Sequence, residues 1–234
     1  MRLIDELIES AAPFDCPVRR VCIGLHWTAV ESRHVGMSHT FRGLEKYEVV
    51  QAGDLVGRSA LELAGRLRSW EPLEASLGLA ALNSLIEPQG APGNVQTYII
   101  REARLKSVVV VGRFPFNEQL SHIAGRLQVL EMQPQGDELP SHACEDVLPN
   151  AEIAVISATA LINKTLPRLM ELAARAKVLV LGPSTPMNDV LFRHGAHVLA
   201  GVRVTNADAL MGALVQGVKK FDLLTGAQAI MRFC

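Results

Sequence analysis

The feature that most constrains the fold is a series of short apolar runs in the C-terminal part of the chain, separated by segments of helical length. The runs are Ser107 to Gly112, Leu127 to Met132, Ile153 to Ser157, Val178 to Gly182 and Val198 to Val204. Continuous Val, Ile and Leu are typical of strands buried on both faces, and parallel strands need crossovers of about ten residues or more. From about Val95 onward the sequence therefore predicts an α/β domain with a Rossmann-like parallel sheet.

The N-terminal part has a different pattern. Leu3, Ile4, Leu7 and Ile8 recur at helical spacing, which predicts a short amphipathic helix that ends before Pro13. Two strand-like stretches follow, Val18 to Leu25 and Trp27 to Ser32, and Gly36 to Thr40 is either a turn or a short strand. Together they predict an antiparallel meander. Ser59 and Glu62 then form a capping-box signature, and Pro72 suits the first residue of a helix reaching about Ile86.

Strands followed by helices favour a smaller α+β domain, here over residues 1–90. The Pro- and Gly-rich segment 88–93 is the predicted linker, and residues 94–234 form the Rossmann-like domain.

Composition and charge exclude several classes of protein. Hydrophobic residues make up 49% of the chain and charged residues 20%, which is typical of a folded globular protein. The net charge of −1 and the scattered basic residues argue against binding of nucleic acid. An acidic N-terminus and the absence of a run of about 18 apolar residues argue against a secretory signal or a membrane span, so a soluble, cytoplasmic protein is expected.

Metal-binding motifs are absent. The four cysteines show no C-x-x-C spacing, which indicates neither a structural zinc site nor a disulfide framework. His34 and His39 lie five residues apart and are weak metal candidates, because this spacing does not place both on one helix face. Any metal would therefore use dispersed ligands or arrive with a bound chelator.

In an open α/β sheet the ligand crevice lies beyond the carboxyl ends of the strands, so the loops after the strands are the candidate sites. In the first loop, Gly112, Phe114 and Pro115 follow a strand, but a dinucleotide fingerprint would have glycines at Phe114 and Asn117. Glu131 lies about 20 residues beyond Gly112, where an acidic residue could accept a ribose hydroxyl or serve only as a solvated or capping carboxylate.

The other two loops carry short hydroxyl and amide side chains. In the second, Thr159, Asn163 and Thr165 precede a helix, and Thr165 is a candidate N-cap. In the third, formed by Gly182, Ser184 and Thr185, the following Pro186 suits the first helical position and makes Thr185 the predicted N-cap. These groups either only cap helices or bind a ligand anion or carbonyl at a positive helix end. We predict that all three loops meet at one edge of the sheet.

The motifs Gly112-x-Phe114-Pro115-Phe116, Thr159 to Thr165 and Leu181 to Pro186 together resemble the family described as putative heavy-metal chelation, a domain of unknown function. The resemblance spans most of Val95 to Phe221. It implies a Rossmann-like domain preceded by a small domain like the N-terminal domain of enolase. It also implies an interdomain cleft that handles a metal ion or a metal-chelating small molecule.

Three functions remain open at this point. The first is binding, with or without catalytic processing, of a small anionic molecule or metal chelate in the interdomain cleft. The second is an enzyme with a nucleotide-type cofactor, which rests on the Rossmann-like pattern and Glu131 and is opposed by Phe114. The third is a non-catalytic interaction protein. The sequence does not decide whether a reaction is catalysed or whether the chain forms a homo-oligomer.

Overall fold

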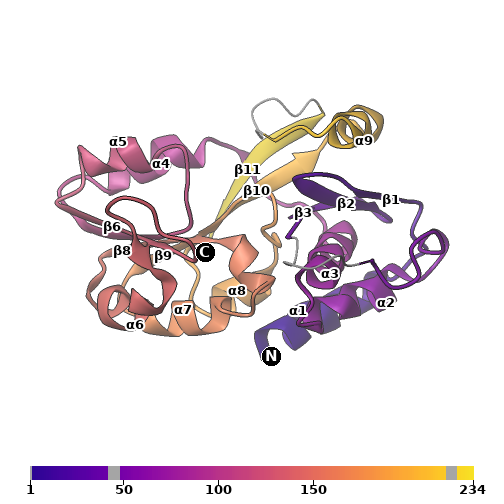
Figure 1. Ribbon diagram of the computed structural model, residues 1–234, viewed down its shortest axis with the longest axis horizontal. Helices are drawn as coiled ribbons and strands as arrows, with labels where there is room; N and C mark the ends of the chain where they lie inside the picture. Colours follow the sequence, from indigo (N-terminus) through magenta and orange to yellow (C-terminus); the bar gives the residue numbers. More distant parts are fainter. Residues whose placement is uncertain (1, 42–47, 220–225) are drawn as a thin grey trace.

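The structure is a computed structural model that describes residues 2–41, 48–219 and 226–234 (Figure 1). Within these residues the larger sheet has eight strands in the order β4-β11-β10-β9-β8-β5-β6-β7. Its parallel strands are β5 (Ser107–Val111), β6 (Arg126–Glu131), β7 (Leu139–Pro140), β8 (Ile153–Ser157), β9 (Lys177–Leu181) and β10 (Val198–Val204). The first of these strands, β5, lies beside the fourth, β8, as in doubly wound Rossmann sheets.

Two antiparallel strands extend this sheet beyond β10. They are β11 (Ala227–Phe233), which pairs with the whole of β10, and β4 (Ala91–Pro92), which pairs with Met231 and Ile230 of β11. The segment 88–93, predicted as a linker, therefore contributes a short edge strand to the larger sheet.

Helices cover both faces of the larger sheet (Figure 1). They are α4 (Val95–Glu102), α5 (Asn117–Ser121), α6 (Cys144–Val147), α7 (Leu166–Leu172) and α8 (Asp189–Arg193). In β5, Val108 and Val110 belong to the buried cluster that includes Ile99 of α4, whereas Val109 belongs to the cluster that includes Leu169 of α7. Alternate strand residues thus face opposite helical layers, which explains the continuous apolar runs in the sequence.

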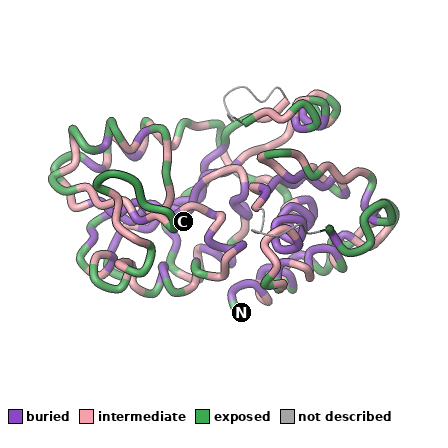
Figure 2. Tube along the Cα trace, in the orientation of Figure 1, coloured by how far each residue is buried: buried purple, intermediate pink, exposed green. Residues whose placement is uncertain are grey.

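The N-terminal part is an antiparallel meander of β1 (Arg20–Ile23), β2 (Trp27–Glu31) and β3 (Val35–His39), covered by α1 (Arg2–Ala11), α2 (Ala60–Ala64) and α3 (Pro72–Leu85). Its core is built from buried residues of these helices and of the sheet, as the purple segments of Figure 2 show. Ser59 Oγ accepts a hydrogen bond from the Glu62 amide at 3.0 Å, so the predicted cap begins α2. An α/β fold with a smaller α+β part is confirmed.

Helix α9 (Ala207–Val215) belongs to the C-terminal part of the sequence but packs on the small sheet (Figure 1). Its Leu210, Met211 and Leu214 form a buried cluster with Ala29 of β2 and Met37 of β3. The small sheet is therefore covered on both faces, by α3 on one and by α9 on the other.

The predicted start of α8 is wrong. The helix begins at Asp189, and Asn188 caps it by accepting a hydrogen bond from the Val190 amide at 2.9 Å. Thr185 is not the N-cap; its hydroxyl donates to the Gly182 carbonyl oxygen at 2.8 Å within the preceding turn. Proline is favoured in turns as well as at the first position of a helix, and Pro186 lies in the segment that precedes α8.

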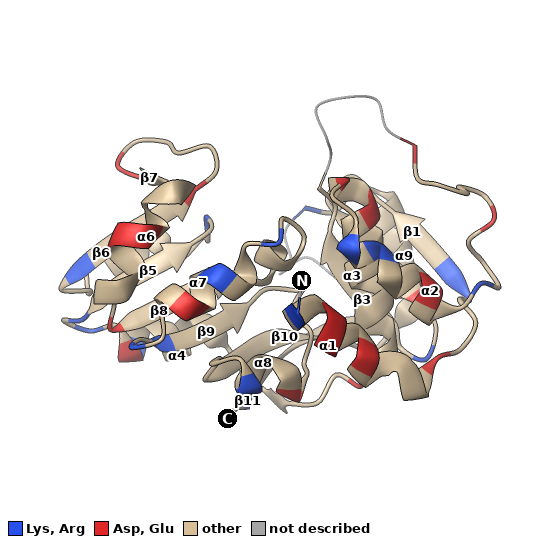
Figure 3. Cartoon of the chain, turned by 90° about the horizontal axis from the view of Figure 1, so that it is seen from below, with Lys and Arg blue, Asp and Glu red and all other residues tan. Residues whose placement is uncertain are grey.

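Charged residues of both signs are spread over both parts of the protein (Figure 3). In the described part of the chain, no helix has the length and apolar character needed to cross a bilayer.

Candidate functional site

A cleft of about 690 Å³ lies where the strand order of the larger sheet reverses, beyond the carboxyl ends of β5 and β8. Open α/β sheets bind ligands at this position, because the loops of the two strands diverge there and leave a crevice. His39 and Phe41, at the end of β3, also line the cleft, so residues of both parts contribute to it.

Six of the predicted site residues line this cleft: Gly112, Phe114, Glu131, Thr159, Asn163 and Thr165. They come from the loops after β5 and β8 and from the end of β6. The loop after β9 leaves the same edge of the sheet, since β9 runs parallel to β8. Its residues Gly182, Ser184 and Thr185 do not line the cleft, and neither does Pro115, which is exposed after β5.

Ser184 and Thr185 have structural partners. Ser184 Oγ accepts a hydrogen bond from the His39 amide at 2.9 Å, and its carbonyl oxygen accepts one from Asn83 Nδ2 at 3.0 Å. Thr185 lines a narrow void of about 20 Å³, which is room for little more than a water molecule. This loop joins the larger sheet to β3 and α3 and offers no hydroxyl to the cleft.

The loop after β5 differs from a dinucleotide-binding turn. The rings of Phe114 and Phe116 stack with centroids 5.1 Å apart and planes 6° from parallel. Gly112 has a φ of +115°, and a Cβ added there would lie 3.4 Å from the Phe114 ring. The aromatic side chain therefore occupies space next to Gly112 that a pyrophosphate needs for close approach to the backbone.

The polar groups after β8 bind one another. Ser157 Oγ and Thr159 Oγ1 share a hydrogen bond of 2.8 Å. Asn163 Oδ1 accepts hydrogen bonds from the Thr165 amide at 3.2 Å and from its hydroxyl at 2.7 Å. Thr165 occupies the N-cap position of α7, as predicted, but its side chain does not accept a bond from that helix. The side chains of this loop therefore hold it together through their own hydrogen bonds.

Lys164 lines the cleft but is not among the site residues predicted from the sequence. It is half-buried, has a left-handed φ of +66°, and its Nζ donates a hydrogen bond to the Ile162 carbonyl oxygen at 2.6 Å. Burial lowers the pKa of Lys164 to about 8. Among the described residues no carboxylate pairs with it. Non-glycine residues held in this conformation are uncommon and cluster at functional sites.

The arginines of the cleft, in contrast, are already paired. Arg113 Nε donates to Glu138 Oε1 at 2.8 Å, and the guanidinium lowers the pKa of that carboxyl. Arg168 pairs with Glu145 and likewise lowers the pKa of its carboxyl. These two ion pairs neutralise their own charges, so Lys164 is the cation with most to gain from a bound anion.

A bare metal ion does not fit the described residues. Glu131, His142 and Cys144 line the cleft, but no three His, Cys, Asp or Glu side chains in residues 2–41, 48–219 and 226–234 converge on one point. Burial also raises the pKa of the Cys144 thiol, which disfavours the thiolate that metals bind. The two candidate histidines are separated, since His39 lines the cleft and His34 lines another cavity.

The sequence matches two family models, DUF364 over residues 94–229 and DUF4213 over residues 4–86, and both are described as putative heavy-metal chelation. Neither description mentions an enolase-like domain, so that likeness stays a prediction. No curated protein matches the chain.

Two solved structures of the DUF364 family, both of proteins with unknown function, are similar to this chain. The protein from Desulfitobacterium hafniense is 27% identical with a TM-score of 0.90, over 100% of this chain and 98% of that one. The protein from Pyrococcus horikoshii is 20% identical with a TM-score of 0.81 over the same shares, which shows a common fold.

Proposed function

This chain belongs to the DUF364 family, and from that premise we propose that its cleft binds a small anionic molecule or metal chelate through Lys164. The family description supports a metal-binding role. Because the described residues hold no ligand set for a bare cation, the metal would enter the cleft already held by an anionic chelator. The chelate is thus the ligand, and the protein supplies shape and positive charge.

The half-buried ammonium of Lys164 is the observation that carries this proposal. Burial without a carboxylate partner disfavours the charged form, which is why the pKa of Lys164 falls to about 8. A bound anion would restore a favourable interaction for that charge. The hydrogen bond from Lys164 Nζ to the Ile162 carbonyl oxygen, at 2.6 Å, holds the ammonium in position, and a positioned group loses less entropy when it binds a ligand.

The remaining surface of the cleft suits an organic ligand. Apolar side chains from both parts line it, including Phe41, Phe114, Leu130 and Met132. Its volume of about 690 Å³ is in the range of small-molecule sites. A cleft that combines apolar walls with a cation and hydrogen-bonding groups binds an organic anion better than a hydrated inorganic ion.

Calorimetry with citrate, nickel citrate and nickel chloride tests the proposal on the native protein. We expect citrate or its nickel complex to bind and nickel chloride to bind much more weakly. Lys164→Gln should weaken anion binding roughly tenfold, because a charge-assisted hydrogen bond is lost. Lys219→Gln, at an exposed lysine outside the cleft, is the matched control and should leave binding unchanged. Submicromolar binding of free nickel, or equal affinity for Lys164→Gln and wild type, would contradict the proposal.

The position of Glu131 favours a second candidate, an enzyme with a nucleotide-type cofactor. Glu131 ends β6 and lines the cleft, and the second strand of a Rossmann sheet carries the ribose-binding acid at this place. Its Oε2 already accepts a hydrogen bond from the Met132 amide at 3.1 Å. Calorimetry with NAD and AMP distinguishes the two candidate functions. If either nucleotide binds to wild type and binds more weakly to Glu131→Gln, the enzyme with a nucleotide-type cofactor is favoured. If neither nucleotide binds, the binding of a chelate is favoured.

A further inference from the structure

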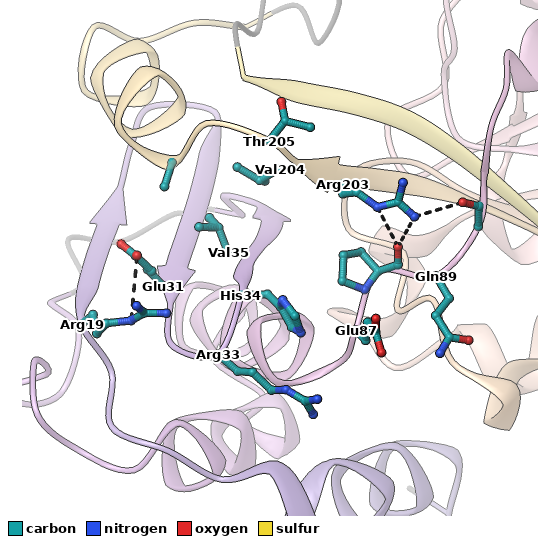
Figure 4. Close-up of a pocket in the computed structure, with 13 residues that line it drawn as sticks. Arg19, Glu31, Arg33, His34, Val35, Glu87, Gln89, Arg203, Val204 and Thr205 are labelled. Atoms are coloured by element: carbon teal, nitrogen blue, oxygen red, sulfur yellow. Dashed lines mark hydrogen bonds and ion pairs between the residues drawn. The ribbon is translucent and has the colours of Figure 1, made fainter.

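A second cavity, of about 670 Å³, is lined by residues of both parts (Figure 4) and shares no lining residue with the cleft. Arg33 and His34 reach it from the turn between β2 and β3. Glu87 and Gln89 come from the segment after α3, and Arg203 comes from β10. Three segments far apart in the sequence thus line one open cavity.

Arg203 is held in place by backbone carbonyl groups. Its Nε and one terminal nitrogen donate to the Pro88 carbonyl oxygen at 3.2 Å and 2.9 Å, and the same terminal nitrogen donates to Gly90 at 3.0 Å. Carbonyl oxygens satisfy its N–H groups but carry no net charge. Within the described residues no carboxylate pairs with Arg203, so its positive charge is not neutralised.

Arg33 and Glu87 also lack ion pairs in the described part of the chain, although both line this cavity. The Arg33 guanidinium lies over the Phe14 ring, 4.3 Å from its centroid. The other carboxylate of the cavity, Glu31, is already paired with Arg19 and Arg20. The cavity therefore presents two guanidinium groups and one carboxylate that form no ion pair among the described residues.

His34 lies between these groups (Figure 4). Its Nε2 is buried and has no hydrogen-bond partner among the described residues. Burial lowers the pKa of His34, Arg33 lowers it further, and Glu87 acts in the opposite direction. Arg33 and Glu87 are therefore close enough to His34 to influence its pKa. A neutral imidazole has one hydrogen-bond donor and one acceptor, so His34 can also form a hydrogen bond beside the cavity.

We propose that this cavity binds a zwitterion, an amino acid or a short peptide, with its carboxylate at Arg33 and Arg203 and its ammonium at Glu87. A simple anion would meet the unpaired carboxylate of Glu87, and a simple cation would meet the two guanidinium groups. A molecule that carries both charges pairs with all three residues. The volume admits an amino acid or a dipeptide, and this site is independent of the function proposed for the cleft.

A panel of L-amino acids and a panel of dipeptides, measured by thermal shift and calorimetry on the native chain, test this inference. The two panels distinguish a free amino acid from a peptide as the source of the zwitterion. For the best binder, the analogue without the amine and the analogue without the carboxylate should each bind roughly tenfold more weakly, because each loses one charged pair. If no zwitterion binds, or if either analogue binds equally well, the inference is wrong.

Substitutions of lining residues test whether the zwitterion binds in this cavity. Arg33→Gln and Glu87→Gln should each weaken the zwitterion roughly tenfold. Arg126→Gln and Glu118→Gln, at exposed positions outside the cavity, are the charge-matched controls and should bind as wild type does. Lys164→Gln should also leave the zwitterion unaffected, which separates this cavity from the cleft. Wild-type affinity in Glu87→Gln would overturn the assignment.

Discussion

The backbone amide of His39, at the end of β3, donates a hydrogen bond to Ser184 Oγ, in the loop after β9, at 2.9 Å. Ser184 is only 1% exposed. Because His39 also lines the cleft, this bond fixes the wall that the small sheet contributes relative to the strands of the larger sheet.

Ser184→Ala should destabilise the protein by about 1–3 kcal/mol, because the His39 amide then lacks its acceptor in a partly buried place. Urea unfolding measures the change in the free energy of unfolding. Ser121→Ala removes a hydroxyl that donates to Glu118 on the exposed surface of α5, and its effect should stay within about 0.5 kcal/mol. Equal unfolding midpoints for Ser184→Ala and wild type would show that the bond does not hold the two parts together.

Gly36→Ala should destabilise the protein severely. A Cβ at position 36 would lie 2.2 Å from the Ala80 carbonyl oxygen and 2.2 Å from the Ser84 nitrogen, so α3 would have to move away from β3. Gly212→Ala, inside α9 with open space around the added Cβ, should instead stabilise the protein by about 0.5–1 kcal/mol. Thermal unfolding of both variants checks the pair, and a stable Gly36→Ala variant would contradict the close approach of α3 and β3.

Local sequence patterns predicted much of the sheet. The predicted runs Ile153 to Ser157 and Val198 to Val204 coincide with β8 and β10, because each is rich in Val, Ile or Leu, which favour buried strands. The two-residue strands β4 and β7 gave no such pattern, since their positions depend on neighbouring strands that are distant in the sequence. The packing of α9 on the small sheet also depends on residues that are distant in the sequence, so no local pattern predicts it.

The site could be predicted in part. Strand direction placed Gly112 and Thr159 correctly at one edge of the sheet, and six predicted residues line one cleft. The third loop does not line this cleft, because the Ser184 and Thr185 hydroxyl groups form internal hydrogen bonds, which the sequence alone does not reveal. Lys164 was missed because lysine has no intrinsic preference for a left-handed backbone, which tertiary structure imposes here.

Asn188→Ala should lower the free energy of unfolding by about 1 kcal/mol, within a range of roughly 0.5–2 kcal/mol. Its side chain caps α8 and also donates a hydrogen bond to Ser10 Oγ of α1 at 3.1 Å. Thr185→Ser keeps the hydroxyl group that stabilises the preceding turn and is the control, with little expected change. Chemical denaturation compares the two. If Thr185→Ser lowers the free energy of unfolding more than Asn188→Ala does, Thr185 and not Asn188 caps α8.

Lys164 should make stability depend on alkaline pH. Its pKa is about 8 in the folded protein against an ordinary value of 10.5, so between these values the unfolded chain binds more protons at this residue. The free energy of unfolding of wild type should therefore rise with pH in this window, relative to that of Lys164→Gln, in urea titrations. A constant difference between the two proteins across the window would show that Lys164 is not desolvated.

The affinity of the cleft for anions should show the opposite dependence on pH. Below about pH 8 the Lys164 ammonium is charged and attracts an anion, and above it the neutral amine loses that attraction. A bound anion also favours the charged form, so the decline should begin above pH 8 in the complex. Calorimetric titration of citrate from pH 7 to pH 10 measures this, with ionic strength held constant because salt screens charge pairs. Lys164→Gln should bind more weakly at pH 7 and show little change over the same range. If wild type and Lys164→Gln lose affinity in parallel, another group controls the titration, and Lys164 is not the cation that the anion contacts.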